Sequence, residues 1–157
     1  MAVIIEPMLF EDLPAVVAIE KDSFTSPWSL KSFRYELSCN RRATYLVARV
    51  DGTVVGYGGV WIILDEAHIT TLAVDRRFRR CGIATRLLAA LIDISCQKGA
   101  ERITLEVRPS NHPARRLYEK FGFTVKGVRK KYYINEDGLI MFKEDLPRVG
   151  DNREPAS

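Results

Sequence analysis

The sequence predicts a single α/β domain, classed as α+β in some schemes, with a mixed, mostly antiparallel sheet of about six to seven strands and about four helices. Three observations predict it. Segments with helical apolar spacing alternate with β-rich runs along the chain. Two of these runs are joined by a tight turn that is typical of an antiparallel hairpin. The 157 residues are enough for one core and too few for two ordinary domains.

The N-terminal segment predicts a strand followed by a helix. Residues 3–8 form an extended, largely apolar run, and Asp12 is expected to cap a helix that continues to about residue 22. The expected buried face of this helix holds Leu13, Val16, Val17 and Ile19 or Glu20.

A second helix and a hairpin are predicted next. Ser29 is the expected N-cap, and apolar residues follow it at i, i+3 and i+7, namely Leu30, Phe33 and Leu37. Residues 44–50 and 54–63 are β-rich, and the Asp-Gly-Thr connection at 51–53 is a hairpin signal. We expect these two strands to pair antiparallel.

The middle of the chain continues the meander and then enters a long helix. Residues 64–67 lead into a third consecutive strand at 68–74, and a helix over 83–98 is expected to close at Gly99 in a left-handed conformation. Its buried face is expected to hold Ala84, Leu87, Leu88, Leu91, Ile92 and Ser95. Another strand is predicted at 102–107.

A short helix and two strands complete the predicted sheet. Pro113 suits the first turn of a helix that extends to Phe121, and Gly122 is its expected stop. Residues 123–128 and 139–146 are the expected last strands.

Composition and charge argue against several classes of protein. No apolar stretch reaches the roughly 18 residues that cross a bilayer, and no basic region precedes the apolar patch at the N-terminus, so a soluble, cytoplasmic protein is expected. Three cysteines without a C-x-x-C pair, and only two histidines, argue against a disulfide scaffold or a metal site. The net charge of +4 does not require a nucleic-acid partner. The domain is expected to cover 1–146, with a disordered tail at 147–157.

The turn between the strand at 68–74 and the long helix has the pattern of an anion site. Arg79, Gly82 and Ala84 fit the spacing R-x-x-G-x-A. Small residues at the last two positions let a diphosphate approach the main chain at the positive end of the helix dipole. The alternative is a plain connection whose arginines form a solvated charge run. A P-loop nucleotide enzyme is disfavoured because G-K-[ST] is missing.

Three separated motifs, taken in order, resemble the Gcn5-related N-acetyltransferase (GNAT) superfamily. They are the strand meander with its R-x-x-G-x-A turn, the sequence LEVRPSN at 105–111 and the sequence LYEKFGF at 117–123. The resemblance covers residues 3–146 and implies a sheet that is splayed in its middle. Similarity to bacterial members that acetylate the N-terminal alanine of a small-subunit ribosomal protein lies in residues 26–29, 64–67, 105–111 and 132–133.

The resemblance implies acetyl-CoA as cosubstrate, with no metal. In the family the strand backbone pairs with the pantetheine and the following turn holds the pyrophosphate. The positions implied for the cosubstrate are Leu72, Ala73, Val74, Arg79, Arg80, Cys81, Gly82, Ile83, Ala84, Thr85 and Asn111. At Cys81 a packing or spectator role is favoured over a nucleophilic one, and Asn111 is equally suited to cap a helix.

Glu106 and Tyr118 are the candidate catalytic residues. Strand alternation points Glu106 away from Leu105 and Val107, and the family places its base at the matching glutamate. The alternative is an ordinary solvent-facing strand residue. Tyr118 would act as general acid toward the CoA sulfur, and its alternative is core packing.

The resemblance assigns substrate contacts to Trp28, Tyr132 and Tyr133, which also suit ordinary rim and core positions. His68 is expected to be a strand residue without a chemical role. The segment 132–138 is a few residues shorter than in some members of the superfamily, which leaves the shape of the peptide entrance open.

These observations predict direct, ternary-complex transfer of acetyl to the N-terminal amine of a protein; by resemblance, the target is the N-terminal alanine of a small-subunit ribosomal protein. A terminal amine, with a reference pKa of about 7.7–8.0, demands less of its base than lysine at about 10.4. The alternatives are an enzyme with broader Nα, lysine or small-amine specificity, and a non-catalytic acyl-CoA-binding module. No nucleic acid or membrane partner is implied. The sequence does not determine the oligomeric state and is compatible with a monomer.

Overall fold

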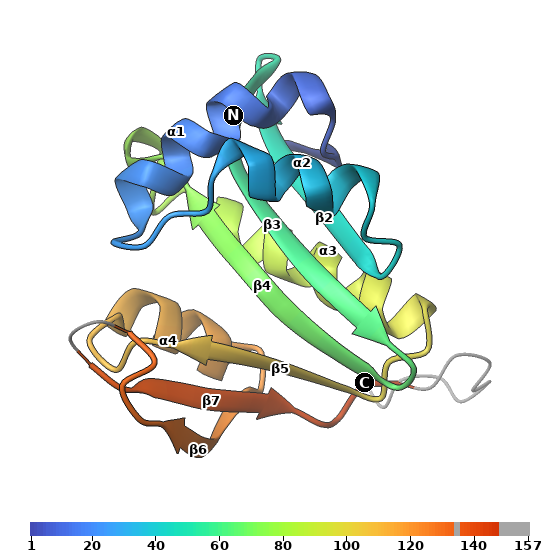
Figure 1. The fold of residues 1–157 in the computed structure, drawn as a ribbon, viewed down its shortest axis with the longest axis vertical. Coiled ribbons are helices and arrows are strands. Elements are labelled where there is room, and N and C mark those ends of the chain that lie inside the picture. The colour runs from blue at the N-terminus through green and yellow to red at the C-terminus, as the bar shows by residue number, and fades with distance from the viewer. Residues whose placement is uncertain (134–135, 148–157) are drawn as a thin grey trace. The chain divides into compact units, whose positions relative to one another are not determined.

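Seven strands form a mixed sheet in the order β1-β2-β3-β4-β5-β7-β6, and four α-helices accompany it in the computed structural model, which describes residues 1–133 and 136–147 (Figure 1). The strands are β1 Ile4–Pro7, β2 Ala43–Val50, β3 Thr53–Ile63, β4 Glu66–Val74, β5 Arg102–Val107, β6 Thr124–Arg129 and β7 Gly138–Lys143. The helices are α1 Leu13–Ser23, α2 Leu30–Ser38, α3 Ile83–Gln97 and α4 His112–Lys120. The predicted fold class is confirmed. Within the described residues, no helix is both long and apolar enough to span a bilayer.

The chain divides into two compact units. The first consists of residues 1–61 and 69–93, and the second of residues 62–68 and the chain from 94 onward. The parallel register of β4 with β5 runs from Glu66↔Arg102 to His68↔Thr104, so it stops where the division crosses β4. The expectation of a single domain over 1–146 stays a prediction, and the expected disorder falls on a tail that, from 148, lies outside the described residues.

The first unit begins with an antiparallel meander. β1 pairs with β2, and β2 pairs with β3 from Ala43↔Trp61 to Val50↔Thr53. The two turn residues, Asp51 and Gly52, both have positive φ, at 49° and 79°. That combination matches the right-handed twist of the flanking strands, and the predicted hairpin is confirmed.

Helices cover both faces of this meander. α1 and α2 lie on one face and α3 on the other (Figure 1). Two glycines of β3 let α3 pack closely, because a Cβ on Gly56 would lie 3.2 Å from the Leu87 side chain and one on Gly58 would lie 2.9 Å from the Leu91 side chain. On the other face Phe33 is fully buried, with ring centroids 6.0 Å from Tyr57 and 6.3 Å from Tyr45.

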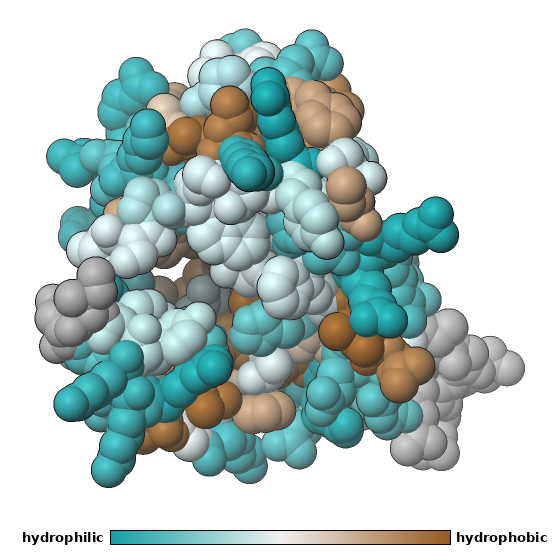
Figure 2. All heavy atoms as spheres, viewed as in Figure 1, coloured by the Kyte–Doolittle hydropathy of each residue, from teal (hydrophilic) through white to brown (hydrophobic). Residues whose placement is uncertain are grey.

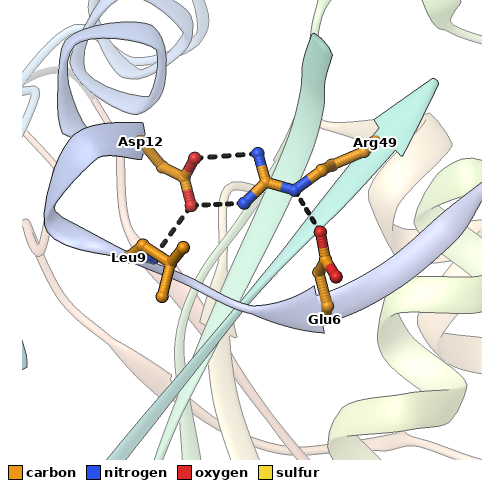
Figure 3. Close-up of polar contacts among 4 residues, drawn as sticks. All are labelled: Glu6, Leu9, Asp12 and Arg49. Atoms are coloured by element: carbon orange, nitrogen blue, oxygen red, sulfur yellow. Dashed lines mark hydrogen bonds and ion pairs between the residues drawn. The ribbon is translucent and has the colours of Figure 1, made fainter. Parts of the chain in front are cut away.

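The role of Asp12 in the first unit differs from the prediction. Asp12 is the residue before α1, but its side chain does not cap that helix. Instead, Asp12 Oδ2 accepts the Leu9 amide at 2.8 Å and both carboxylate oxygens pair with Arg49, which also pairs with Glu6 (Figure 3). In α2, Ser29 caps as expected, with Oγ accepting the Ser32 amide at 3.1 Å.

The buried face of α2 also differs from the prediction. Leu30 is 40% exposed, whereas Glu36 is buried beside Phe33. A carboxylate was not expected in the core, because apolar spacing alone does not reveal polar partners on another element.

The second unit inserts its last strand into the sheet. β7 lies between β5 and β6 and pairs antiparallel with both. Gly99 and Gly122 have φ of 92° and 91° and end α3 and α4 as predicted. β4 begins two residues earlier than expected, at Glu66, because the turn before it needs only two residues, Leu64 and Asp65, with φ 55° at Leu64. β7 ends at Lys143 rather than at 146.

Candidate active site

The arginine turn of the first unit has a left-handed backbone at two positions. Arg80 has φ 62° and Gly82 has φ 77°. Arg79 Nε donates to the Val74 carbonyl at 3.3 Å, which ties the turn to the end of β4. Alternation of right- and left-handed residues aims successive amides to one side, a geometry that binds anions.

The first turn of α3 supplies further amide donors. Arg86 N donates to the Gly82 carbonyl at 3.2 Å, so the amides of Ile83, Ala84 and Thr85 precede the first full helical hydrogen bond. Ile83 is buried and anchors the helix start, whereas Arg80, Cys81 and Gly82 are exposed. A Cβ on Gly82 would meet nothing within 4 Å. Diphosphate therefore has open access to main-chain donors at the positive end of α3.

The neighbouring arginines are not all available to an anion. Arg76 pairs with Asp22 at 2.9 Å, and Arg77 pairs with Asp75 at 3.0 Å. The hydrogen bonds from Arg77 hold the pKa of Asp75 below its usual value. The two arginines assigned to the cosubstrate, Arg79 and Arg80, form no ion pair with a described acidic residue.

The other first-unit positions assigned to acetyl-CoA lie at the end of β4 and in the turn itself. Ala73 and Val74 are buried at the end of β4, and Leu72 is half-buried. Cys81 is an exposed free thiol whose Sγ lies 3.6 Å from the Arg79 carbonyl oxygen. That environment fits the spectator role favoured for it.

Glu106 lies on β5 with the alternation that the sequence predicts. Ile103, Leu105 and Val107 are buried, whereas the Glu106 side chain faces the other way and keeps 13% of its surface exposed. Arg129, at the end of β6, donates from Nη1 to Glu106 Oε1 at 2.8 Å, and its own side chain is 58% exposed. The carboxylate is thus positioned by a cation that also contacts water.

Tyr132 and Tyr133 lie in the same part of the second unit. Burial, followed by hydrogen bonding to Glu106, raises the pKa of Tyr132, and the Arg129 guanidinium lies 4.8 Å from its ring centroid. Tyr133 packs edge-on against Tyr132, with 4.8 Å between the ring centroids. The Arg108 guanidinium carbon lies 4.3 Å from the centroid of the Tyr133 ring. Burial raises the pKa of Tyr133 to about 12. Two of the three proposed substrate residues are therefore brought together with the proposed base.

Tyr118 and Asn111 belong to α4. Tyr118 is buried and packs against Phe123 at 5.7 Å, so its packing role is real. Burial, with a further contribution from Tyr133, raises the pKa of the Tyr118 hydroxyl, which is therefore protonated at neutral pH. Asn111 caps α4, with Oδ1 accepting the Ala114 amide at 3.3 Å, as the sequence suggests.

Trp28 belongs to the first unit. Its ring packs 5.3 Å from Phe33, and its amide donates to Glu20 Oε2 at 2.9 Å.

His68, half-buried on β4, has its pKa lowered by burial, and Glu106 and Arg129 are its charged neighbours.

Sequence reasoning missed a residue that contacts the proposed base and a second polar cluster in the same unit. Arg129 contacts Glu106, and Arg108 contacts Glu136, whose Oε1 also accepts from Ser110 Oγ at 2.5 Å. Arg129 reaches Glu106 because β7 separates their strands by one position and Glu106 lies opposite Ile140. No local spacing in the sequence reports that strand order.

Comparisons with known proteins agree on one family. The model described as the Acetyltransferase (GNAT) family matches residues 13–123. The chain is 45% identical over 137 residues to a putative [ribosomal protein bS18]-alanine N-acetyltransferase of Bacillus subtilis, covering 86% of this chain and 91% of the relative. It is 36% identical over 129 residues to the [ribosomal protein bS18]-alanine N-acetyltransferase of Escherichia coli, covering 81% and 84%.

Solved structures give the same result. The crystal structure of the ribosomal-protein-S18-alanine N-acetyltransferase from Escherichia coli superposes with a TM-score of 0.86 at 32% identity, covering 98% of this chain and 100% of that one. Ard1 from Thermoplasma volcanium superposes with a TM-score of 0.85 at 27% identity, covering 94% and 100%.

Proposed function

Because the chain belongs to the acetyltransferase (GNAT) family, we propose that it acetylates the N-terminal alanine of ribosomal protein bS18. The chain is an acetyl-CoA-dependent N-acetyltransferase, and the proposal concerns its acceptor. The observation that carries it is the 45% identity over 91% of a relative whose name states this substrate. The amide-lined turn at Gly82 supports the donor half of the reaction, since it fits a diphosphate.

Most residues that this proposal assigns to acetyl-CoA lie in the first unit, and Asn111 lies in the second. Amides of Ile83, Ala84 and Thr85 would hold the diphosphate, and exposed Arg79 and Arg80 would add charge. The main chain of residues 72–74 would pair with the pantetheine. Acetyl-CoA supplies the acetyl group as a thioester: the amine attacks its carbonyl carbon, the C–S bond breaks, and the coenzyme A thiolate leaves.

Glu106 is the proposed base. Its carboxylate would take a proton from the α-ammonium or the attacking amine, directly or through one water. Arg129 holds Oε1, so the hydrogen bond that it donates fixes the direction of the carboxylate. Because an α-amine has a reference pKa of only about 7.7–8.0, one carboxylate suffices for this deprotonation.

Tyr118 is the proposed acid for the departing sulfur. Its hydroxyl is protonated at neutral pH, as a donor must be, but its raised pKa also makes the proton costlier to release. A thiol has a reference pKa of about 8.5, which is lower than the raised pKa of Tyr118. Tyr118 is therefore expected to stabilise the thiolate by donating a hydrogen bond rather than by transferring its proton completely.

Trp28, Tyr132 and Tyr133 are proposed to contact the acceptor peptide. The paired tyrosines offer polar tips on packed rings, which suits an extended peptide. The protein partner in this proposal is therefore bS18 through its N-terminal segment, with no nucleic acid or membrane needed.

Mass spectrometry of peptides tests the acceptor. A peptide with the bS18 N-terminus is incubated with acetyl-CoA and enzyme beside a matched peptide whose α-amine is blocked and whose lysines are free. Acetylation confined to the free α-amine supports the proposal. Modification of lysine in the blocked peptide, or thiol release without any modified peptide, would contradict it.

A further inference from the structure

A pocket of about 370 Å³ lies in the first unit, between α2 and the end of β3. Its walls are Trp28, Tyr35 and Trp61, and it is completed by Lys31, Ser32 and Glu36. Pale side chains of intermediate hydropathy gather on the face where α2 overlies β3 (Figure 2). Three aromatic residues and one acidic residue thus line the same pocket.

The Glu36 carboxylate is held by neutral donors. Its Oε1 accepts from the Tyr45 hydroxyl at 2.6 Å and from the Trp61 indole at 2.5 Å, and Oε2 accepts from Asn40 Nδ2 at 2.8 Å. A carboxylate offers about four acceptor positions. Three are used, and one remains on Oε2.

Glu36 is a buried carboxylate without a counter-charge among the residues that the structure describes. The residue is 6% exposed, and no lysine, arginine or histidine of the described chain forms an ion pair with it. A buried carboxylate is costly to leave without an opposite charge, even when neutral groups hydrogen-bond to it. A cation that enters the pocket would supply that charge and the fourth donor.

The aromatic walls favour the same kind of ligand. A cation over the face of an aromatic ring is attracted by the ring quadrupole, and indole is the strongest of the natural rings. A guanidinium is planar and weakly hydrated, so it stacks on indole and still directs N–H groups in its plane toward a carboxylate. The volume admits such a group together with part of its aliphatic stem.

We propose that this pocket binds the cationic side chain of an arginine in the protein substrate. The identity of the peptide rests on the proposed function, whereas cation binding rests on the pocket alone. Lys31 opposes it, because this lysine lines the pocket and carries the same charge as the ligand. Lys31 is exposed, so its side chain extends into water when the pocket is filled.

Intrinsic fluorescence reports on this pocket selectively. The chain contains two tryptophans, Trp28 and Trp61, and both line it. Peptides of one length with an acetylated α-amine, which cannot turn over, are titrated without acetyl-CoA. They carry arginine, citrulline or leucine at one position, and the position is moved along the first five residues. Citrulline keeps the shape of arginine and removes its charge.

We expect the arginine peptide to change the fluorescence and to bind at least tenfold more tightly than the citrulline peptide at one or more positions. Glu36→Gln should abolish this preference, and Lys31→Ala should increase affinity for the arginine peptide. Lys31→Ala changes an exposed residue, so it tests the proposal even if the Glu36 variant does not fold. Equal binding of arginine and citrulline at every position, preference for leucine, or no binding would overturn the inference.

Turnover with unblocked peptides separates this inference from the proposed function. If the arginine peptide binds but no α-amine is acetylated, the proposed acceptor is wrong and the cation pocket stands. If α-amines are acetylated at the same kcat/KM with arginine and citrulline at every position, the function stands and the pocket does not select the substrate.

Discussion

Two carboxylates of the first unit, Glu20 and Asp12, are held differently from Glu106 of the second unit. In the first unit Glu20 is 3% exposed, accepting the Tyr57 hydroxyl at 2.6 Å and the Trp28 amide at 2.9 Å, and Asp12 is enclosed by Arg49 and Leu9. In the second unit Glu106 is paired with an arginine that is 58% exposed. Partners fixed in a core cannot be exchanged for a ligand, whereas a partly hydrated cation can be. We therefore expect the first group to govern stability and Glu106 to govern turnover.

The largest effect should come from Glu106→Gln. Loss of a general base costs roughly 10²- to 10⁴-fold in kcat, while coenzyme A binding and thermal unfolding should change little because an exposed ion pair contributes only about 0–1 kcal/mol. Thiol release and calorimetry measure the two quantities. Glu119→Gln on the exposed face of α4 is the matched control and should keep its activity. A Glu106 variant with normal kcat would remove the distinction between the two units.

Asp12→Asn should show the opposite pattern. Removing one partner of a buried ion pair costs about 3 kcal/mol in the free energy of unfolding, because Arg49 keeps its charge at 15% exposure. The kcat of the folded variant should be unchanged. Urea unfolding and steady-state rates at pH 7 test both, and a loss of kcat at unchanged stability would contradict the assignment.

Asp12 should also make the free energy of unfolding depend on pH in the acid range. Burial opposes ionisation of Asp12, but the Arg49 and Leu9 hydrogen bonds and the Arg49 charge outweigh it and hold the pKa below the usual 3.8. A lowered folded pKa means that the stabilisation is fully present above about pH 4 and is lost as pH falls through the lowered value. The free energy of unfolding of the Asn variant should therefore be flatter across that range than that of the wild type.

Tyr118→Phe should give a smaller kinetic effect than Glu106→Gln. The ring stays packed against Phe123 while the hydroxyl is lost. Since the raised pKa favours hydrogen-bond donation over proton transfer, we expect kcat to fall about tenfold, or about 1.4 kcal/mol, with little change in KM. A loss as large as that of Glu106→Gln would mean that the tyrosine transfers its proton completely.

Gly82→Ala should lower stability only slightly and should mainly weaken coenzyme A binding. At φ 77° an alanine costs about 1 kcal/mol through backbone strain, and its Cβ meets no neighbour. Gly52→Ala is a close control, with φ 79° and no neighbour within 4 Å, in the turn between β2 and β3. Both variants should lose similar stability, but calorimetry should show weaker coenzyme A binding only for Gly82→Ala. Equal binding by both would argue against diphosphate at this turn.

Much of the fold follows from local signals in the sequence. Ser29, the Asp51-Gly52 turn and Gly122 act within a few residues of their own position, so short patterns identify them. The prediction that Asp12 caps α1 is wrong, because its side chain pairs with Arg49, which lies 37 residues away in the sequence. The placement of β7 between β5 and β6 could not be predicted from local patterns either, since the order of strands depends on how the whole sheet packs.

The candidate site divides in the same way. The turn at Gly82 and the outward direction of Glu106 follow from spacing and alternation. The contact of Arg129 with Glu106, 23 residues apart, follows from strand order. The carboxylate of Glu36 in an aromatic pocket was also missed, because Trp61 joins it from 25 residues along the chain.

The exposed thiol at Cys81 makes the arginine turn chemically addressable. Alkylating reagents react with accessible thiolates, and Cys81 is followed directly by the glycine whose main chain is open. A bound nucleotide at this bend would shield the sulfur, so the rate of labelling becomes a footprint of occupancy. Cys39 is the other exposed cysteine and serves as an internal reference within the same molecule.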